Sequence, residues 1–99
     1  MQPTSNLAAP EIDQELEISL DQQQTCHLVV WNDEVNTFDW VITSLMEICN
    51  HSHEQAEQSA LLIHYHGKHA VKVGEYHFLK PMCSSLTERG INATVETFA

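Results

Sequence analysis

The chain has 99 residues and a formal charge of −10, from 14 acidic and 4 basic side chains. One domain is the expectation for this length, and an apolar content of 42% is typical of a folded domain. Nucleic acids and anionic membranes bind basic surfaces, so the negative charge argues against both as partners. A cationic group or a basic partner is favoured, although a high charge also serves solubility alone.

The cysteines indicate a reducing compartment. Cys26, Cys49 and Cys83 lie far apart and form no Cys-x-x-Cys motif. We find neither the basic start and apolar core of a signal peptide nor an apolar run near the ~20 residues of a membrane span. We therefore expect a cytosolic protein, monomeric, whose cysteines are buried and structural.

The first residues differ from the rest of the chain. Residues 1–10 are rich in Ser, Thr, Pro and Ala, and residues 11–24 are acidic, contain a Gln run and lack a sustained helical stripe. This composition predicts a flexible acidic arm over residues 1–24. The arm is either inert or a segment that another protein binds. Residues 25–99 then form the folded domain.

The domain begins with a strand, a polar turn and a helix. A short apolar, β-rich run predicts a strand at residues 26–31. The turn of Asn32, Asp33 and Glu34 follows. Apolar residues at helical spacing then predict a helix over residues 37–49, capped by Asn36 or Thr37. Polar groups at such a junction, beside apolar helix residues, suit a ligand that is charged at one end and apolar at the other.

The remaining elements follow in the order helix, strand, helix, strand. Ser52 and Gln55 fit a capping box for a helix over residues 53–66, which Gly67 ends. Alternation predicts strands at residues 70–74 and 91–96. Between them, Pro81 leaves two possibilities: a kinked helix from residue 75, or a main helix that starts near residue 80. The order βααβαβ predicts a small α+β sandwich, with a three-stranded antiparallel sheet and three helices on one face.

Seven histidines raise the possibility of a metal site. On a helix, however, His64 and His66 point to different sides, and no Cys pair or His-Glu-x-x-His motif supports zinc. We expect no metal. His64 shares an apolar helix face with Ala60 and Ile63, where a lone histidine is most often a hydrogen-bonded core residue. In contrast, we interpret His51, His53, His69 and His77 as surface residues.

Signatures of catalysis are missing from the sequence. It has three glycines, no Gly-rich phosphate loop and no Gly-x-Ser-x-Gly motif. Asp33 and Glu34 are adjacent, so their carboxylates diverge in most turns and do not form an acid–base pair. We therefore expect a binding module that is not an enzyme and has no cofactor.

Three motifs in register give the chain a family resemblance. They are Val-Trp-Asn-Asp-Glu at residues 30–34, His-Tyr-His-Gly-Lys at residues 64–68 and Thr-Val-Glu at residues 94–96. Together they resemble ClpS, the adaptor of the AAA+ Clp protease that recognises N-terminal degradation signals. The match covers about residues 26–97 and leaves out the arm.

The resemblance implies how a substrate is bound. Members bind proteins whose first residue is Leu, Phe, Tyr or Trp, and hold its free ammonium through residues that correspond to Asn32, Asp33 and His64. A carboxylate, an amide oxygen and an imidazole nitrogen are suitable acceptors for an ammonium group. The positions implied for the side-chain pocket are Phe38, Val41, Ala60, Ile63 and Ile91, with Glu34 and Asn36 at its rim.

The sequence departs from the family at several of these positions. Glu34 replaces an Asp, Asn36 a Thr and Phe38 a Met. Ala60 stands where a bulky Met often forms a gate, so the pocket can be wider or admit β-branched side chains.

The resemblance also implies a docking partner. Members dock on the N-terminal domain of the unfoldase through a carboxylate and a Lys near the third helix, here matched by Glu75 and Lys80. The arm would be the segment that the unfoldase engages when the substrate is handed over.

Two alternatives stay open from the sequence. One is a protein–protein scaffold of the same fold without a pocket for a terminal residue, because fold alone does not determine function. The other is a histidine-based metal carrier.

Overall fold

The computed structural model describes residues 25–97. The predicted arm at residues 1–24 lies outside this range. The elements in chain order are β1 (Thr25–Trp31), α2 (Phe38–Cys49), α3 (His53–His66), β2 (Lys68–Glu75), α4 (Tyr76–Glu88) and β3 (Ala93–Thr97). The predicted order βααβαβ is therefore confirmed. No helix within residues 25–97 is long and apolar enough to cross a lipid bilayer.

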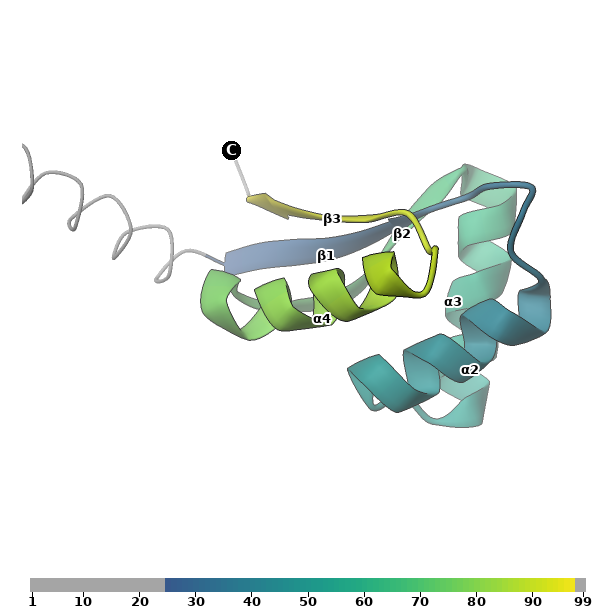
Figure 1. Cartoon of the computed structure of the whole chain (residues 1–99), viewed down its shortest axis with the longest axis horizontal. Helices are drawn as coiled ribbons and strands as arrows, with labels where there is room; N and C mark the ends of the chain where they lie inside the picture. Colours follow the sequence, from purple (N-terminus) through teal and green to yellow (C-terminus); the bar gives the residue numbers. More distant parts are fainter. Residues whose placement is uncertain (1–24, 98–99) are drawn as a thin grey trace, which may run out of the picture.

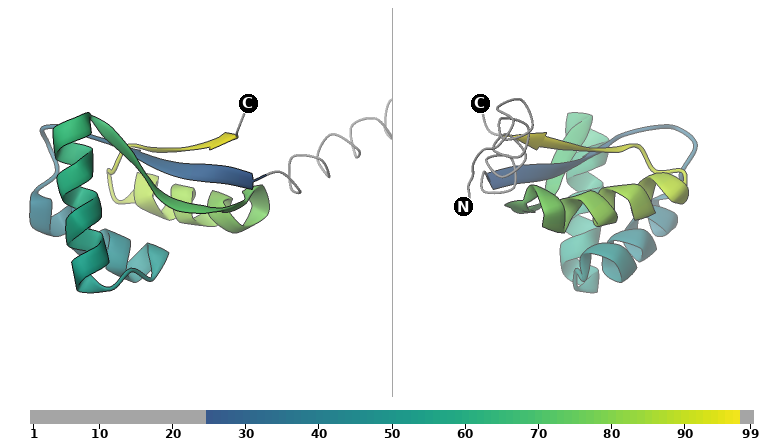
Figure 2. Two further views of the ribbon diagram at one scale, coloured as in Figure 1. Left: turned by 180° about the vertical axis from the view of Figure 1, so that it is seen from behind. Right: turned by 60° about the vertical axis from the view of Figure 1, so that its left-hand side comes forward.

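The three strands form one antiparallel sheet with β1 in the centre, in the order β2-β1-β3. All three helices lie on the same side of this sheet (Figure 1). The helix α4 runs along the sheet and contacts every strand, whereas α3 contacts β2, and α2 packs on α3 and α4. The view from behind shows α3 crossing the end of the sheet where β1 leaves it (Figure 2). The predicted α+β fold is confirmed.

Alternation along β1 builds the core between the sheet and the helices. Cys26, Leu28 and Val30 are each 1% exposed or less and belong to the main apolar cluster. Burying a side chain of this size contributes about 1.5–3 kcal/mol. The largest helical side chains in the cluster are Leu45, Leu79 and Leu86.

Side-chain caps set the starts of α2 and α3, and residues with positive φ set their ends, Asn50 (φ = +59°) for α2 and Gly67 for α3. The Thr37 hydroxyl accepts the Trp40 N–H at 3.1 Å, and the Ser52 hydroxyl accepts the Gln55 N–H at 3.1 Å. Gly67 ends α3 with φ = +87°, and its N–H donates to the Ile63 carbonyl. These local signals are why the predicted limits of the two helices hold to within a residue.

Both edge strands differ from their predicted limits. Lys68 pairs with Trp31, so β2 starts before the predicted Ala70. Backbone pairing with β1, rather than alternation, fixes this end. The strand β3 starts at Ala93, because the Ile91 N–H donates to the Leu86 carbonyl at the end of α4. Ile91 therefore lies in the turn that follows α4.

Pro81 lies within α4, which is a single helix through this residue. The prediction of a main helix from residue 80 is wrong. Proline removes one backbone N–H and costs a helix interior about 3 kcal/mol. Leu79 and Leu86, on either side of Pro81 along the chain, are fully buried. Their packing stabilises the helix through the proline.

Two histidines differ from their expected burial. His51 is not a surface residue: it is 5% exposed, and its Nε2 lies 2.9 Å from the Val71 carbonyl, to which it donates. Burial lowers the pKa of His51. His64 is not a core residue but is exposed. Tertiary packing, which helical spacing does not show, determines both positions.

The cysteines follow the prediction in part. Cys26 and Cys49 are buried, and Cys83 is half-buried. Burial raises the pKa of the Cys49 thiol to about 11. This thiol is therefore protonated at neutral pH, as expected of a structural cysteine.

Gly67→Ala tests the left-handed end of α3. An added Cβ at Gly67 would meet no atom within 4 Å, so only backbone strain should destabilise the variant, by about 1–2 kcal/mol. Gly67→Asn should lose less, because asparagine tolerates positive φ. Urea unfolding measures both, and an alanine variant as stable as the wild type would contradict the argument.

Candidate functional site

The turn between β1 and α2 is organised by the carboxylate of Asp33. Its Oδ1 accepts the backbone N–H groups of Val35 at 2.9 Å and Asn36 at 2.8 Å. Its Oδ2 accepts the side-chain Nδ2–H of Asn36 at 2.8 Å. The backbone hydrogen bond from Asn36 is the largest cause that lowers the pKa of Asp33. The carboxylate is therefore ionised at neutral pH.

Backbone hydrogen bonds join this turn to two other parts of the chain. The Asn32 N–H donates to the Gly67 carbonyl at 2.8 Å, which places the turn beside the end of α3. The Trp31 N–H donates to the Asn92 carbonyl at 2.9 Å, which holds the residues before β3. As a result, three segments that are far apart in the sequence meet at one end of the sheet.

His64 comes to this meeting point from the last turn of α3. Its side chain is exposed, and its ring lies edge-on to the ring of Tyr65, with the centroids 5.3 Å apart. A neutral imidazole has one nitrogen that donates and one that accepts a hydrogen bond, and an exposed ring is accessible to a ligand.

A cavity of about 360 Å³ lies between these segments. This volume falls within the range of about 300–1,000 Å³ that is typical of small-ligand sites. Every residue predicted for the amine site, the apolar pocket and its rim lines it: Asn32, Asp33, Glu34, Asn36, Phe38, Val41, Ala60, Ile63, His64 and Ile91.

The structure adds lining residues that the sequence argument missed, namely Val30, Trp31 and Thr37. The available signal was closeness in sequence: Trp31 and Thr37 are next to predicted site residues, and Val30 is two residues before Asn32. Trp31 is fixed by two contacts, since its Nε1–H donates to the Thr94 hydroxyl at 3.0 Å and the Lys68 ammonium lies 4.8 Å from its ring.

The lining of the cavity is partly polar and partly apolar. The polar residues include the acidic Asp33 and Glu34, and no lysine or arginine is among the residues that line it in the described chain. Of the apolar residues, Ala60, Ile63 and Ile91 are buried, whereas Phe38 is 40% exposed. Such a cavity can hold a group with a cationic end and an apolar end.

Glu75 and Lys80 lie elsewhere. Glu75 pairs with Thr25 at the start of β1, the opposite end of that strand from the cavity. Its carboxylate lies 3.3 Å from His77, whereas the Lys80 ammonium donates to the Tyr76 hydroxyl at 3.0 Å. The two charges therefore have different partners and do not form a pair with each other.

The comparison with known families identifies the chain. The family model of the ATP-dependent Clp protease adaptor protein ClpS matches residues 21–94. The chain belongs to the ClpS family. ClpS proteins are adaptors of the Clp protease and not enzymes, in agreement with the expected binding module.

Individual ClpS proteins are distant relatives. The ClpS adapter of Corynebacterium aurimucosum is 25% identical over 95 residues, which cover 94% of this chain and 86% of the relative. That of Corynebacterium glutamicum is 23% identical over 94 residues, covering 95% and 94%. Agrobacterium tumefaciens ClpS2, solved with bound L-phenylalaninamide, has the same fold with a TM-score of 0.67 at 18% identity, over 76% of this chain and 98% of ClpS2.

Asp33→Asn tests the turn through the pH dependence of stability. Because folding lowers the pKa of Asp33, its carboxylate contributes stability that is fully present above the unfolded-state pKa of about 3.9 and is lost as the pH falls through the folded-state pKa. The wild type should therefore be more stable than the variant at about pH 6, and this difference should shrink at about pH 3. Urea unfolding at both pH values measures it.

Glu57→Gln is the matched control, since Glu57 is an exposed carboxyl on α3. It should keep the wild-type change in stability between the two pH values. An Asp33→Asn variant that loses as much stability on acidification as the wild type would show that the turn does not depend on this charge.

Proposed function

We propose that this ClpS-family chain binds the first residue of a substrate protein and delivers the protein to a Clp-type AAA+ unfoldase. The recognised residue carries a free ammonium group and a large hydrophobic side chain: Leu, Phe, Tyr or Trp. The observation that carries the proposal is the cavity, whose lining combines an ionised carboxylate with buried apolar side chains.

The ammonium half has hydrogen-bond acceptors that are available to a ligand. A carboxylate has about four lone-pair sites, and the Asp33 carboxylate uses three of them within the turn. One stays available for an ammonium group, as a charge-assisted hydrogen bond. The side-chain oxygen of Asn32 and a ring nitrogen of His64 are the other acceptors that we propose. An acetylated terminus would lose the positive charge and most of its donors.

The apolar half supplies the remaining affinity. Burial of a Leu or Phe side chain contributes about 1.5–3 kcal/mol, so binding requires both halves. The relative ClpS2 was solved with L-phenylalaninamide, which carries an ammonium group and a phenyl side chain on one small molecule. That ligand has the two features for which the cavity of this chain is suited.

Delivery needs a second surface. Glu75, at the opposite end of β1 from the cavity, and Lys80, in the second turn of α4, are our candidates for docking on the N-terminal domain of the unfoldase. Both are exposed, so they are accessible while the cavity is occupied. We propose that the protein acts in the cytoplasm as a monomer, with residues 1–24 as the segment engaged during delivery.

Peptide binding tests the proposal directly. Labelled peptides that begin with Phe, Leu, Ile or Arg, each with a free or an acetylated N-terminus, are titrated by fluorescence anisotropy. We expect free Phe and Leu peptides to bind, and acetylation to weaken the Phe peptide at least about tenfold, since hydrogen bonds to charged groups contribute about 1.5–3 kcal/mol. Equal binding of free and acetylated Phe peptides would rule out the proposal.

The same titration with His64→Ala assigns the ammonium site to this cavity. We expect affinity for the free Phe peptide to fall about tenfold, by the loss of one such hydrogen bond. His66→Ala is the matched control, because His66 is exposed on the same helical turn and does not line the cavity. Equal losses in the two variants would contradict the assignment.

Ala60→Met tests the size of the apolar half. Ala60 is 3% exposed and lines the cavity, so a longer side chain should fill part of the space. We expect the variant to lose affinity for a Trp peptide by about tenfold more than for a Leu peptide, since a misfit of a few atoms in an apolar pocket costs roughly 1–3 kcal/mol. Anisotropy measures both, and equal losses would show that Ala60 does not limit side-chain size.

A further inference from the structure

The turn that carries Ile91 is bound to α2 through its backbone. The Trp40 Nε1–H donates to the carbonyl of Arg89 at 3.2 Å, and the Asn36 Nδ2–H donates to the carbonyl of Gly90 at 2.9 Å. These are the two carbonyls that immediately precede Ile91. The segment that forms one wall of the cavity is therefore held from the side of α2, whose residues Phe38 and Val41 line the cavity as well.

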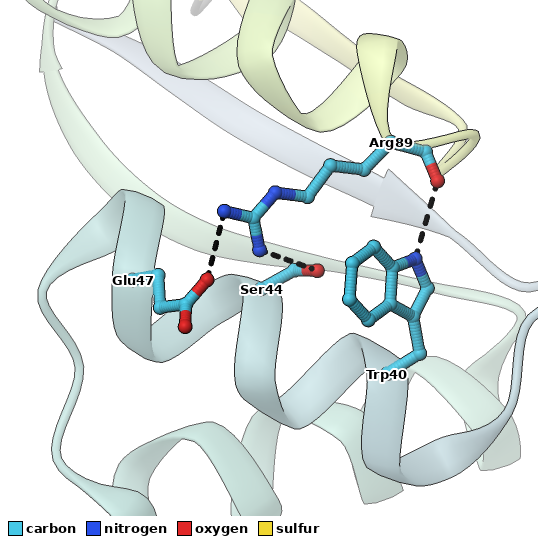
Figure 3. Close-up of polar contacts among 4 residues, drawn as sticks. All are labelled: Trp40, Ser44, Glu47 and Arg89. Carbon is cyan, nitrogen blue, oxygen red and sulfur yellow. Dashed lines mark hydrogen bonds and ion pairs between the residues drawn. The ribbon is translucent and has the colours of Figure 1, made fainter.

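The side chain of Arg89 in turn donates to residues of α2, as Figure 3 shows. Its guanidinium donates to the Ser44 hydroxyl at 3.2 Å and lies 2.8 Å from the Glu47 carboxylate. It also lies over the ring of Trp40, 5.2 Å from the centroid. We call Trp40, Ser44, Glu47 and Arg89 the clamp.

The contacts of the clamp contribute unequally to its stability. The Ser44 side chain is fully buried, and an unpaired polar group there would be unfavourable. The Glu47 carboxylate is more than half exposed, and an exposed ion pair contributes little. The hydrogen bond of Arg89 to Ser44 and the contacts with Trp40 are therefore the part that fixes the turn against α2.

The width of the apolar half depends on this contact. Ile91 is 2% exposed on one side of the cavity, and Phe38 and Val41 belong to α2. The distance between α2 and the turn at Ile91 sets the space between these walls. Neither Trp40 nor Arg89 lines the cavity, so both can act on a bound side chain only through the position of that wall.

We propose that Arg89 and Trp40 are positioning residues that set the width of the apolar half and thereby its preference among first side chains. This inference rests on the proposed recognition of a hydrophobic first residue. Asn36 is excluded from the test because its amide also binds Asp33, so replacing it would disturb the ammonium half as well.

The test compares a Leu peptide with a Trp peptide, each with a free N-terminus, on two clamp variants. Trp40→Phe keeps an aromatic ring and removes the Nε1–H, and Arg89→Met keeps the apolar stem and removes the guanidinium. If the turn at Ile91 can move away from α2, the pocket has more room for a Trp side chain, and a Leu side chain loses its contact with Ile91. We expect the ratio of the two dissociation constants to shift towards Trp by about tenfold in Arg89→Met and by less in Trp40→Phe.

Two further measurements separate positioning from a loss of folding. The factor by which acetylation weakens the Phe peptide should stay as in the wild type, since the ammonium half is untouched. Thr43→Ala, an exposed change on α2, should leave the Leu-to-Trp ratio unchanged. Thermal unfolding establishes that each variant is folded at the temperature of the titration, and Trp40→Phe carries the test if Arg89→Met does not fold.

The outcomes distinguish this inference from the proposed function. If the wild type binds the free Phe peptide and the folded clamp variants keep the wild-type Leu-to-Trp ratio, the positioning role is wrong and the proposed function stands. An equal loss of affinity for both peptides also overturns it. Failure of the wild type to bind any free hydrophobic terminus would overturn both together.

Discussion

The geometry of the site depends on the carboxylate of Asp33. It accepts the N–H groups that turn the chain from β1 into α2, and through the Asn36 amide it is linked to the carbonyl of Gly90. A proposed ligand contact is therefore also a structural element. Loss of binding in a variant of Asp33 would not distinguish a lost contact from a refolded turn, whereas the exposed His64 can be changed without that ambiguity.

Three separate segments form the cavity: the turn after β1 with the start of α2, the helix α3, and the turn after α4. Hydrogen bonds join the turn after β1 to both other segments: to the end of α3 from Asn32 to Gly67, and to the turn after α4 from Trp31 to Asn92 and from Asn36 to Gly90. A domain this small has a limited core. Polar contacts at the end of the sheet therefore add to the stability that apolar packing between the sheet and the helices provides.

Local signals explain what the sequence could predict. Thr37, Ser52 and Gly67 set the helix ends, since a cap or a left-handed residue acts within one turn. His51 was misplaced because its hydrogen bond to Val71 in β2 is known only from the fold. Ile91 lies outside the predicted strand because its N–H bonds to the Leu86 carbonyl. For Pro81 the sequence left two helix starts open, and packing of α4 decides between them. The site residues came from motifs that the family shares. The bond from Arg89 to Ser44 was beyond prediction, because it joins the turn after α4 to α2, and the approach of these two segments is known only from the fold.

Two departures from the family pattern, Ala60 and Asn36, affect the shape of the same cavity. Ala60, where the resemblance implies a bulky gate, is buried and contributes little volume to the wall on α3. The position of Ile91 relative to α2 then decides how closely a bound side chain fits. Asn36, where the resemblance implies Thr, provides a hydrogen bond to the carbonyl just before that wall. The cavity thus combines a small residue on α3 with a turn at Ile91 that is held by hydrogen bonds. Selectivity in this chain should therefore depend on the hydrogen bonds that hold Ile91 in place more than on the bulk of a gate.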